Sequence, residues 1–359
     1  MSSDGSAPVS SPQPLFGSRD LADWVRAGGI PQRRITAYAL RLAWHAYWFE
    51  FNWRTESRQL DERHLPADPL FIIGPWRSGT TVLHELLASA TGWLTPRTWQ
   101  CFNPSTCFLA RSPVEVRSIE RPMDQGRIAS HGPQEDEFAL LLLGEPSPYR
   151  AFIDPRRLPE CSALLRSASD PPLTRWQCFL RGIASPGSRL LLKSPNHTFR
   201  LPRLRALFPQ AQFLWVGRDI GEVLASNLRM WQAMFARYAL WSCPSGALET
   251  FLSQALEAST LALERCLGEM PPGRMLWVDF ERLRADPTQV MRRVLEFLNA
   301  GSQDHACERA LSRALQDIPV HPGSRERVSL DASIEQRLQQ LMSVARLRFG
   351  GEMGQAPSR

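Results

Sequence analysis

The chain has 359 residues, of which 43% are hydrophobic, so it is long enough for one large domain or two small ones with a sizeable core. Its formal net charge of +6 suits an anionic ligand, a nucleic acid or a membrane surface. The arginines are dispersed along the chain instead of gathered in a tail, which disfavours nucleic acid as a partner. No apolar, uncharged run reaches the ~18 residues of a membrane-spanning helix, so no span is predicted.

The cysteines and the N-terminus indicate the compartment. The seven cysteines are an odd number without a Cys-x-x-Cys pair, which is typical of reduced thiols and not of a disulfide framework or a zinc site. The first residues lack the basic and apolar regions of a signal peptide. We therefore expect a cytoplasmic protein. Residues 1–17, rich in Ser, Pro and Gly, and residues 350–359 are expected to be flexible tails around a single domain at 18–349.

The first structured segment is predicted to be helical and aromatic. Residues 19–60 have a helical pattern, and aromatic side chains are concentrated within residues 35–53. Apolar side chains fall nearly all round this helix, so we expect it to pack on the core or to line the mouth of a pocket. A helix lying on a membrane surface is the alternative, although such helices usually carry a cleaner basic face.

Residues 69–84 are the most informative stretch of the chain. The apolar run at 70–73 predicts a buried strand, which breaks at Gly74 and Pro75 and leads through a short loop into a helical pattern from Thr80. Backbone N–H groups converge in such a loop, and the helix dipole favours negative charge there. The sequence therefore predicts an anion-binding site at this turn.

The loop is similar to a Walker A motif but departs from it. The spacing Gly74-x4-Gly79 fits, yet Thr80 stands where the lysine belongs, and the cation is Arg77 inside the loop. The alternative is an ordinary strand-to-helix turn with an incidental arginine. The candidate phosphate ligands of this loop are Arg77, Ser78, Gly79, Thr80 and Thr81.

Short apolar runs recur along the chain, and a helical pattern follows most of them. Strands are predicted at residues 70–74, 189–193, 212–217 and 274–279. This alternation predicts a parallel sheet with helices on both faces. The long segments at about 98–185 and 231–270 are expected to form a lid over the carboxyl ends of the strands, where ligands bind in such sheets.

Lys193 is the single lysine among the 42 basic residues. A bias toward arginine explains the other basic positions, so this lysine indicates a place where a compact point charge serves better than a planar guanidinium. A stray lysine at a strand end is the alternative interpretation.

A second strand-and-helix unit follows at residues 213–227. Arg218 ends the predicted strand, Asp219 is a candidate N-cap, and Ser226 lies eight residues after Arg218. An arginine fork and a serine hydroxyl at one edge of a sheet can bind a second phosphate. Such a pair is common by itself, but here it follows the phosphate loop and Lys193 in order.

Taken together, these segments resemble sulfotransferases that use 3′-phosphoadenosine-5′-phosphosulfate (PAPS), in the bacterial branch related to protein-tyrosine and carbohydrate enzymes. The resemblance covers about residues 68–300 and is carried by residues 71–87, 133–143, 190–226 and 276–298. It implies an α/β, P-loop-like three-layer fold with a central parallel sheet, helices on both faces and helical lid insertions. It also implies PAPS as co-substrate and no metal, and no metal-ligand cluster is visible in the sequence.

The resemblance also implies roles. Arg77 and the amides of residues 78–81 would hold the 5′-phosphate, Arg218 and Ser226 the 3′-phosphate, and Lys193 would neutralise the leaving oxygen during in-line transfer. Residues 322–327 are similar to a basic late loop that closes over the nucleotide. The acceptor is not identified: a small molecule, carbohydrate, lipid or peptide would fit. Aromatic residues at 231–241 are expected mostly in the core, with an apolar acceptor pocket as the other use.

The general base is left open. Related enzymes often carry a catalytic Glu where this chain has residues 94–100, which contain no carboxylate. The candidates are Glu135 and Asp136 of the acidic triplet 135–137, and His197, four residues after Lys193. The triplet follows Pro133, so its acids could instead complement the dipole of a helix that starts there. His197 could instead be a helix cap or a core residue. His84 is expected to pack or to line the acceptor side.

Two other functions compete with sulfuryl transfer. A P-loop kinase or other nucleoside triphosphatase is disfavoured by the missing lysine of the loop. A non-catalytic nucleotide-binding protein on the same fold is compatible with the missing early Glu. The sequence does not indicate the oligomeric state.

Overall fold

The computed structural model describes residues 35–60, 63–108, 119–120, 127–166, 173–299, 305–318 and 325–350. The predictions for residues 1–34, including the flexible N-terminal tail, and for residues 351–359 lie outside the described residues.

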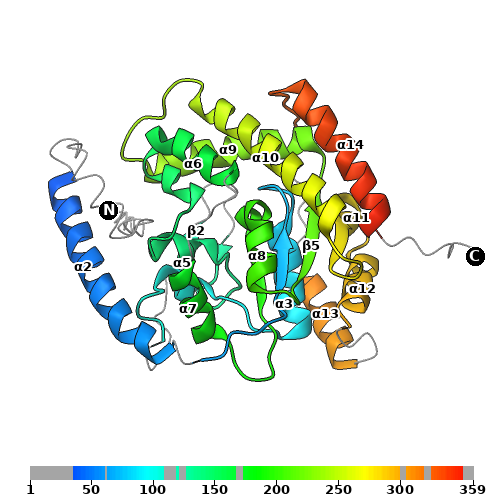
Figure 1. The fold of residues 1–359 in the computed structure, drawn as a ribbon, viewed down its shortest axis with the longest axis horizontal. Helices are drawn as coiled ribbons and strands as arrows, with labels where there is room; N and C mark the ends of the chain where they lie inside the picture. Colours follow the sequence, from blue (N-terminus) through cyan, green and yellow to red (C-terminus); the bar gives the residue numbers. More distant parts are fainter. Residues whose placement is uncertain are drawn as a thin grey trace, which may run out of the picture.

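A four-stranded parallel sheet with the order β4-β1-β5-β6 forms the centre of the fold (Figure 1). Its strands are β1 (Leu70–Ile73), β4 (Leu191–Lys193), β5 (Gln212–Gly217) and β6 (Met275–Asp279). These lie within two residues of the predicted bounds, so the predicted sheet is confirmed. Phe71 is in register with Leu192 and with Phe213, and a single bridge between Leu94 and Leu190 continues the sheet beyond β4.

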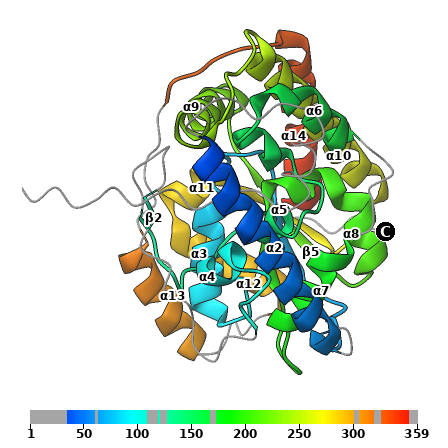
Figure 2. The ribbon, with the colours of Figure 1, turned by 90° about the vertical axis from the view of Figure 1, so that its left-hand side faces the viewer.

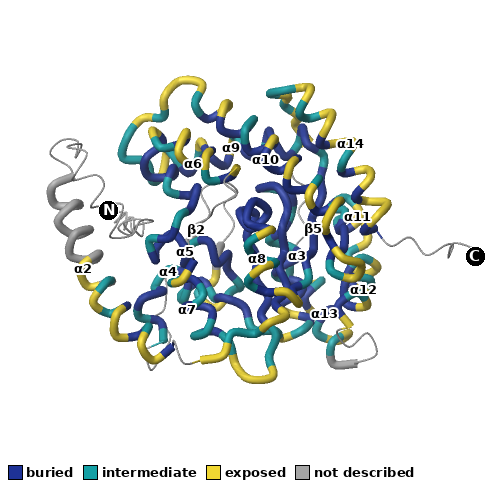
Figure 3. The backbone as a smooth tube through the Cα atoms, in the orientation of Figure 1, coloured by how far each residue is buried: buried dark blue, intermediate teal, exposed yellow. Residues whose placement is uncertain are grey.

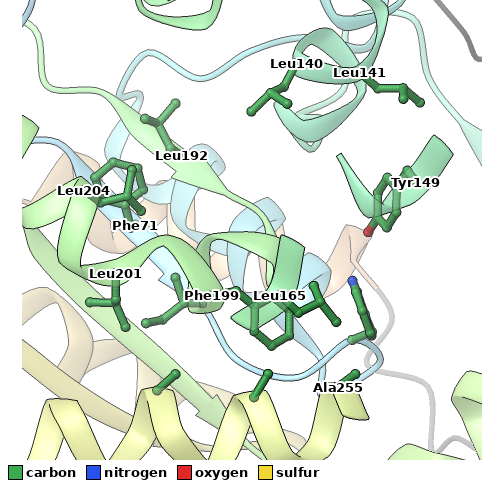
Figure 4. Packing of buried hydrophobic residues seen from close by; sticks show 14 of the residues in the cluster. Phe71, Leu140, Leu141, Tyr149, Leu165, Leu192, Phe199, Leu201, Leu204 and Ala255 are labelled. Atoms are coloured by element: carbon green, nitrogen blue, oxygen red, sulfur yellow. The ribbon is translucent and has the colours of Figure 1, made fainter. Parts of the chain in front are cut away.

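Side chains alternate along the strands and build two cores, one on each face of the sheet. The larger core contains Phe71, Leu192, Phe213, Trp215 and Trp277, and Figure 4 shows Phe71 and Leu192 among the helical residues packed there. The smaller core contains Leu70, Ile72, Leu191, Leu214 and Val278. Strands buried on both faces have the continuous apolar runs that made them predictable.

Helices cover both faces, so the predicted three-layer α/β fold is confirmed (Figures 1 and 3). The larger core is covered by α5 (Glu137–Leu142), α6 (Leu158–Arg166), α7 (Thr174–Ile183), α8 (Leu201–Leu207), α9 (Ile220–Tyr238), α10 (Ala247–Glu269) and α14 (Ala332–Phe349). The smaller core is covered by α3 (Thr80–Thr91), α11 (Phe280–Ala285), α12 (Pro287–Phe297) and α13 (His305–Asp317). The remaining elements are α2 (Ile35–Leu60), α4 (Thr98–Phe102), β2 (Ile119–Glu120), β3 (Arg127–Ile128), η1 (Pro148–Phe152), η2 (Pro155–Arg157) and η3 (Pro195–Arg200).

The two long insertions differ in where they go. The first builds α4 to α7 and brings Glu135 and Tyr149 to the carboxyl end of β4. The second builds the end of α9 and all of α10, which packs beside α6 and α14 within the helical layer. The first insertion therefore supplies side chains to the strand ends, whereas the second thickens the core.

The aromatic helix α2 lies along one side of the molecule and packs against α7 (Figures 1 and 2). Its C-terminal half packs through Trp53 and Leu60, which are buried. Tyr47, Trp48 and Phe51 are exposed instead, so the expectation that the aromatic segment packs on the core holds for only part of it. None of the described helices has the length and apolar character to cross a bilayer.

Candidate active site

The carboxyl ends of the four strands lie at one edge of the sheet, and this edge carries the loop after β1, Lys193 and Arg218. Gly74 follows β1, Ser194 follows β4, Arg218 follows β5, and Asp279 ends β6. β1 lies between β4 and β5, so the chain passes from one side of β1 to the other. Such a switch of direction is where open α/β sheets bind their ligands.

The loop between β1 and α3 needs glycine at both ends. Gly74 and Gly79 have φ values of 137° and 103°, which residues other than glycine rarely adopt. A Cβ on Gly74 would lie 2.5 Å from the carbonyl oxygen of Val216, and one on Gly79 would lie 2.1 Å from the ring of Phe280. Arg77 also has a positive φ of 67°, a strained backbone that is found most often at functional sites.

Neighbouring segments brace this loop by hydrogen bonds. The amide of Gly74 donates to Thr198 Oγ1 over 2.9 Å, and Trp76 Nε1 donates to Asn196 Oδ1 over 3.0 Å. Asn227 of α9 donates from Nδ2 to the carbonyl oxygen of Trp76 over 2.9 Å. The loop is therefore held from η3 on one side and from α9 on the other.

The start of α3 has the features of an anion site. Gly79 is the N-cap and supplies no side-chain acceptor to the first N–H groups of the helix. The hydroxyl of Ser78 is buried and has no hydrogen-bond partner among the described residues. A buried hydroxyl beside uncapped helix amides fits a bound phosphate group, which would accept from both.

The arginine of the loop contacts the segment that carries Arg218 and Ser226. Arg77 Nε donates to Ser226 Oγ over 3.0 Å, and Arg218 Nη1 donates to the carbonyl oxygen of Arg77 over 3.3 Å. Arg218 also pairs with Glu222 at 2.7 Å and lies 4.9 Å over the ring of Phe280. Two segments separated by about 140 residues in the sequence are thus joined by one bond to the Arg77 backbone and one from the Arg77 guanidinium.

Each acid of the triplet pairs with a different basic residue of one short segment. The pairs are Glu135 with Lys193 (3.0 Å), Asp136 with His197 (2.9 Å), and Glu137 with Arg200, which has a second bond of 2.9 Å. Lys193 ends β4, and His197 and Arg200 lie in η3, which follows directly. Only Glu137 lies in the first turn of α5, and Asp136 makes no capping bond, so complementing the helix dipole does not account for the triplet.

Glu135 has two further donors that the sequence did not single out. Tyr149 donates its hydroxyl to Oε1 over 2.7 Å, and Ser194 donates to the same oxygen over 3.1 Å. Burial and then the carboxylate of Glu135 raise the pKa of Tyr149 well above its usual value, so its hydroxyl stays protonated. The position of Ser194 beside Lys193 was a usable signal, whereas nothing in the sequence marks Tyr149.

His197 and Asp136 are enclosed in the core. Both side chains are fully buried, and Trp176 Nε1 also donates to Asp136 Oδ2 over 2.8 Å. The rings of Phe71 and Trp176 lie 5.4 and 5.5 Å from the ring of His197. Packing on all sides ties the segment after β4 to the segment before α5.

His84 on α3 is also fully buried, and its Nε2 lies 2.7 Å from Thr95 Oγ1. Burial and then the positive charges of Lys193 and Arg97 lower the pKa of His84 well below its usual value. Its imidazole is therefore neutral at physiological pH. This environment agrees with packing, one of the two expectations for His84.

The aromatic residues after the second phosphate motif are mostly core. Trp231 is fully buried and lies within 5.6 Å, centroid to centroid, of the rings of Trp76, Phe152 and Phe251. Of the late segment 322–327, residues 322–324 lie outside the described residues. Arg327 pairs with Asp219 at 3.0 Å, which brings the end of the segment to the start of α9. No group of three potential metal ligands gathers in the described part of the chain.

Comparisons with known proteins agree on one family. The model of the Sulfotransferase family matches residues 69–304. Omega-hydroxy-beta-dihydromenaquinone-9 sulfotransferase Stf3 of Mycobacterium bovis is 31% identical over 296 residues, covering 78% of this chain and 74% of the relative. The Stf3 of Mycobacterium tuberculosis matches to the same extent.

Two solved structures share the fold at low sequence identity. Sulfotransferase STF1 from Mycobacterium tuberculosis H37Rv has a TM-score of 0.58 and 17% identity, over 84% of this chain and 87% of that one. Sulfotransferase STF9 from Mycobacterium avium has a TM-score of 0.58 and 19% identity, over 96% of this chain and 99% of that one.

Proposed function

The chain belongs to the sulfotransferase family, and on this premise we propose that it moves a sulfuryl group from PAPS to an acceptor hydroxyl (or amine) by in-line transfer, a reaction for which such enzymes need no metal. The observation that carries the proposal is the 3.0 Å contact between Lys193 and Glu135 at the end of β4. A cation suited to the leaving oxygen and a carboxylate suited to the acceptor proton lie side by side there.

The donor would be held by the two arginines and the start of α3. Arg77, the buried hydroxyl of Ser78, Gly79 and the amides of Thr80 and Thr81 would bind the 5′-phosphate. Arg218 and Ser226 would bind the 3′-phosphate. The hydrogen bond between Arg77 and Ser226 means that the two phosphate groups would bind next to each other and share this network.

PAPS supplies an activated sulfuryl group, whose bond to the bridging oxygen of the 5′-phosphate breaks as the bond to the acceptor oxygen forms. Negative charge develops on the bridging oxygen, and the ammonium of Lys193 would neutralise it there. The acceptor proton would go to a base of this chain. The protein's part is then positioning and electrostatics, because no covalent intermediate is required.

Glu135 is the base that we propose among the three candidates. It touches Lys193 directly, and its side chain keeps a little exposure, whereas those of Asp136 and His197 are fully enclosed and bonded to each other. A base must come within hydrogen-bond reach of the acceptor hydroxyl. We assign Asp136 and His197 the role of holding the segments that carry Glu135 and Lys193.

For the acceptor we propose a hydroxyl on a lipid-like molecule. Support comes from the Stf3 relatives, whose name gives an ω-hydroxylated menaquinone derivative as the molecule they sulfate. A direct test is incubation of the protein with radiolabelled PAPS and hydroxylated lipid quinols, with sugars and tyrosine peptides in parallel. Label in the lipid fraction alone is expected, and label in a sugar or a peptide would overturn this choice.

The donor site is tested first, by calorimetric binding of adenosine 3′,5′-bisphosphate and of ATP, each with and without Mg²⁺. Tight, metal-independent binding of the bisphosphate with weak binding of ATP is expected. Preference for ATP with Mg²⁺ would contradict the sulfotransferase proposal and indicate a kinase. Bisphosphate binding without transfer to any acceptor would favour a non-catalytic nucleotide-binding protein.

A further inference from the structure

The outward side of α2 carries an unusual set of exposed aromatic residues. Tyr47, Trp48 and Phe51 are 66%, 43% and 55% exposed, and their rings contact one another edge to face at 6.4 and 5.8 Å. We call these three residues the α2 aromatic face. Of the six large hydrophobic residues that are exposed in the described chain, three belong to this one helical turn and a half. Tyrosine and tryptophan so placed are typical of side chains at a membrane–water interface.

The opposite side of α2 is firmly attached to the protein. Trp53 and Leu60 are buried, and Glu50 accepts two hydrogen bonds from Arg175 of α7, at 2.9 and 2.8 Å. Buried Glu56 accepts from the amide of Phe108 over 3.0 Å. Because these contacts hold one side of α2 against the protein, the exposed aromatic face is on the side turned toward solvent.

The exposed charge on this part of α2 is positive. Arg54 and Arg58 follow Tyr47 and Phe51 at helical spacing on the same side, and both are exposed. Of the two acids among residues 47–60, Glu56 is buried in its contact with Phe108. Glu50 is shared between Arg175 at 2.8 Å and Arg54 at 3.8 Å, so Arg58 is the exposed cation that no acid of α2 contacts among the described residues. Aromatic side chains followed by arginines complement the headgroups of an anionic lipid surface, where the arginines reach the phosphates.

The helix also lies close to the candidate site. Arg175, which holds Glu50, is followed by Trp176, whose indole donates to Asp136, and Asp136 is the neighbour of Glu135. One helix, α7, thus separates α2 from the acidic triplet. A surface that docked through α2 would lie beside the site.

We propose that the α2 aromatic face, together with Arg54 and Arg58, docks the protein on the surface of an anionic lipid bilayer, with α2 lying in the plane of the interface. This extends beyond the proposed transfer reaction. It would bring the site to an acceptor that stays in the membrane, and it is measured without donor or acceptor. Its failure and that of sulfuryl transfer are therefore distinguishable.

Sedimentation of the full chain with vesicles tests the proposal. The vesicles consist of phosphatidylcholine alone or of phosphatidylcholine mixed with phosphatidylglycerol. Binding to the mixed vesicles is expected, weakened by salt because charge attraction is screened. The triple variant Y47S/W48S/F51S is expected to bind both vesicle types at least about 100-fold more weakly, because three rings no longer leave water. R54Q/R58Q is expected to lose about tenfold on the anionic vesicles only.

A matched control is present on the other side of the molecule. Val344 and Leu347 of α14 are 51% and 76% exposed, and α14 lies opposite α2 in Figure 1. V344S/L347S is expected to bind vesicles like the unchanged protein. Equal loss of binding in this control, or no sedimentation of the unchanged protein with anionic vesicles, would overturn the proposal.

Two other occupants of the face give different results. If a second copy covers it, the triple variant converts a dimer into a monomer in light scattering without vesicles. If another segment of the same chain covers it, the triple variant loses thermal stability in the absence of lipid. Either result would overturn the proposal, whereas a monomer of unchanged melting temperature that has lost vesicle binding supports it.

Discussion

The ammonium nitrogen of Lys193 lies 3.0 Å from Oε2 of Glu135, although 58 residues separate them along the chain. Lys193 ends β4, and Glu135 comes from the loop before α5, so the contact joins the sheet to the first insertion. Tyr149 and Ser194 hold the other carboxylate oxygen. The single lysine of the chain is thus placed against the carboxylate that we propose as base.

Replacement of Lys193 by alanine is expected to lower the transfer rate about 100- to 1,000-fold, because the developing charge on the leaving oxygen loses its cation. The variant would also leave the buried carboxylate of Glu135 without its cation, which destabilises the fold by about 3 kcal/mol. Rate, melting temperature and calorimetric bisphosphate binding are measured together. The double variant K193A/E135Q is the control. Its melting temperature is expected to recover, whereas its transfer rate is expected to stay low. A normal transfer rate in the double variant would exclude Lys193 from the chemistry.

Glu135→Gln is expected to reduce transfer about 100-fold or more while the affinity for adenosine 3′,5′-bisphosphate stays within about twofold. The amide keeps the shape of the side chain and an oxygen for Tyr149, but it cannot take a proton. The pH dependence separates the roles: a base variant loses the rise of rate with pH, whereas a purely structural variant keeps it. Asp136→Asn serves for comparison, since we assign Asp136 to holding the segment.

Arg218 and Ser226 are expected to bind the 3′-phosphate and not the 5′-phosphate. S226A and R218A should weaken binding of adenosine 3′,5′-bisphosphate about ten- to 100-fold, because charge-assisted hydrogen bonds are lost. Their affinity for adenosine 5′-monophosphate, which has no 3′-phosphate, should stay unchanged. Arg77→Ala should weaken both ligands. Calorimetry measures the affinity of each variant for the two nucleotides. If S226A lost the same affinity for the monophosphate as for the bisphosphate, Ser226 would not be a ligand of the 3′-phosphate.

Gly79 and Gly92 provide a matched pair for the phosphate loop. Both have positive φ, of 103° and 65°, but a Cβ meets the ring of Phe280 at Gly79 and open space at Gly92. Gly92→Ala is expected to cost about 1 kcal/mol of unfolding free energy from backbone strain. Gly79→Ala adds a steric clash and should cost about 2–4 kcal/mol. Denaturant unfolding measures both, and equal costs would contradict the close packing of the loop against α11.

His84 is expected to make the fold sensitive to acid. Its pKa is lowered in the folded protein, so the unfolded state takes up the proton first as the pH falls below ~6.5. The stability associated with neutral His84 is therefore present above that pH and is lost below it, with a slope of up to about 1.4 kcal/mol per pH unit. In His84→Gln this slope between pH 7 and pH 5 should be reduced. An unchanged slope would show that other groups cause the acid sensitivity.

The sequence by itself determined the sheet and the position of the glycine-bounded loop between β1 and α3. Residues 70–73 and 213–216 are continuous apolar runs because their strands are buried on both faces, and such runs are visible without any knowledge of neighbours. The glycines of the loop and the order of Arg77, Lys193 and Arg218 along the chain are likewise local features. The three-layer fold followed from this periodic pattern.

Only the tertiary structure decided which basic residue pairs with each acid of the triplet 135–137. Glu135, Asp136 and Glu137 are consecutive, and nothing local distinguishes them. Yet the end of β4 supplies Lys193 to Glu135, and η3 supplies His197 to Asp136 and Arg200 to Glu137. The pair of Asp136 and His197 is fully buried. Tyr149 reaches Glu135 through packing of η1, for which the sequence offers no signal. The aromatic run of α2 was likewise undecided, because periodicity shows which residues share a face but not whether another element covers that face. Burial and long-range pairing depend on what the rest of the chain brings alongside, and local sequence patterns do not contain that information.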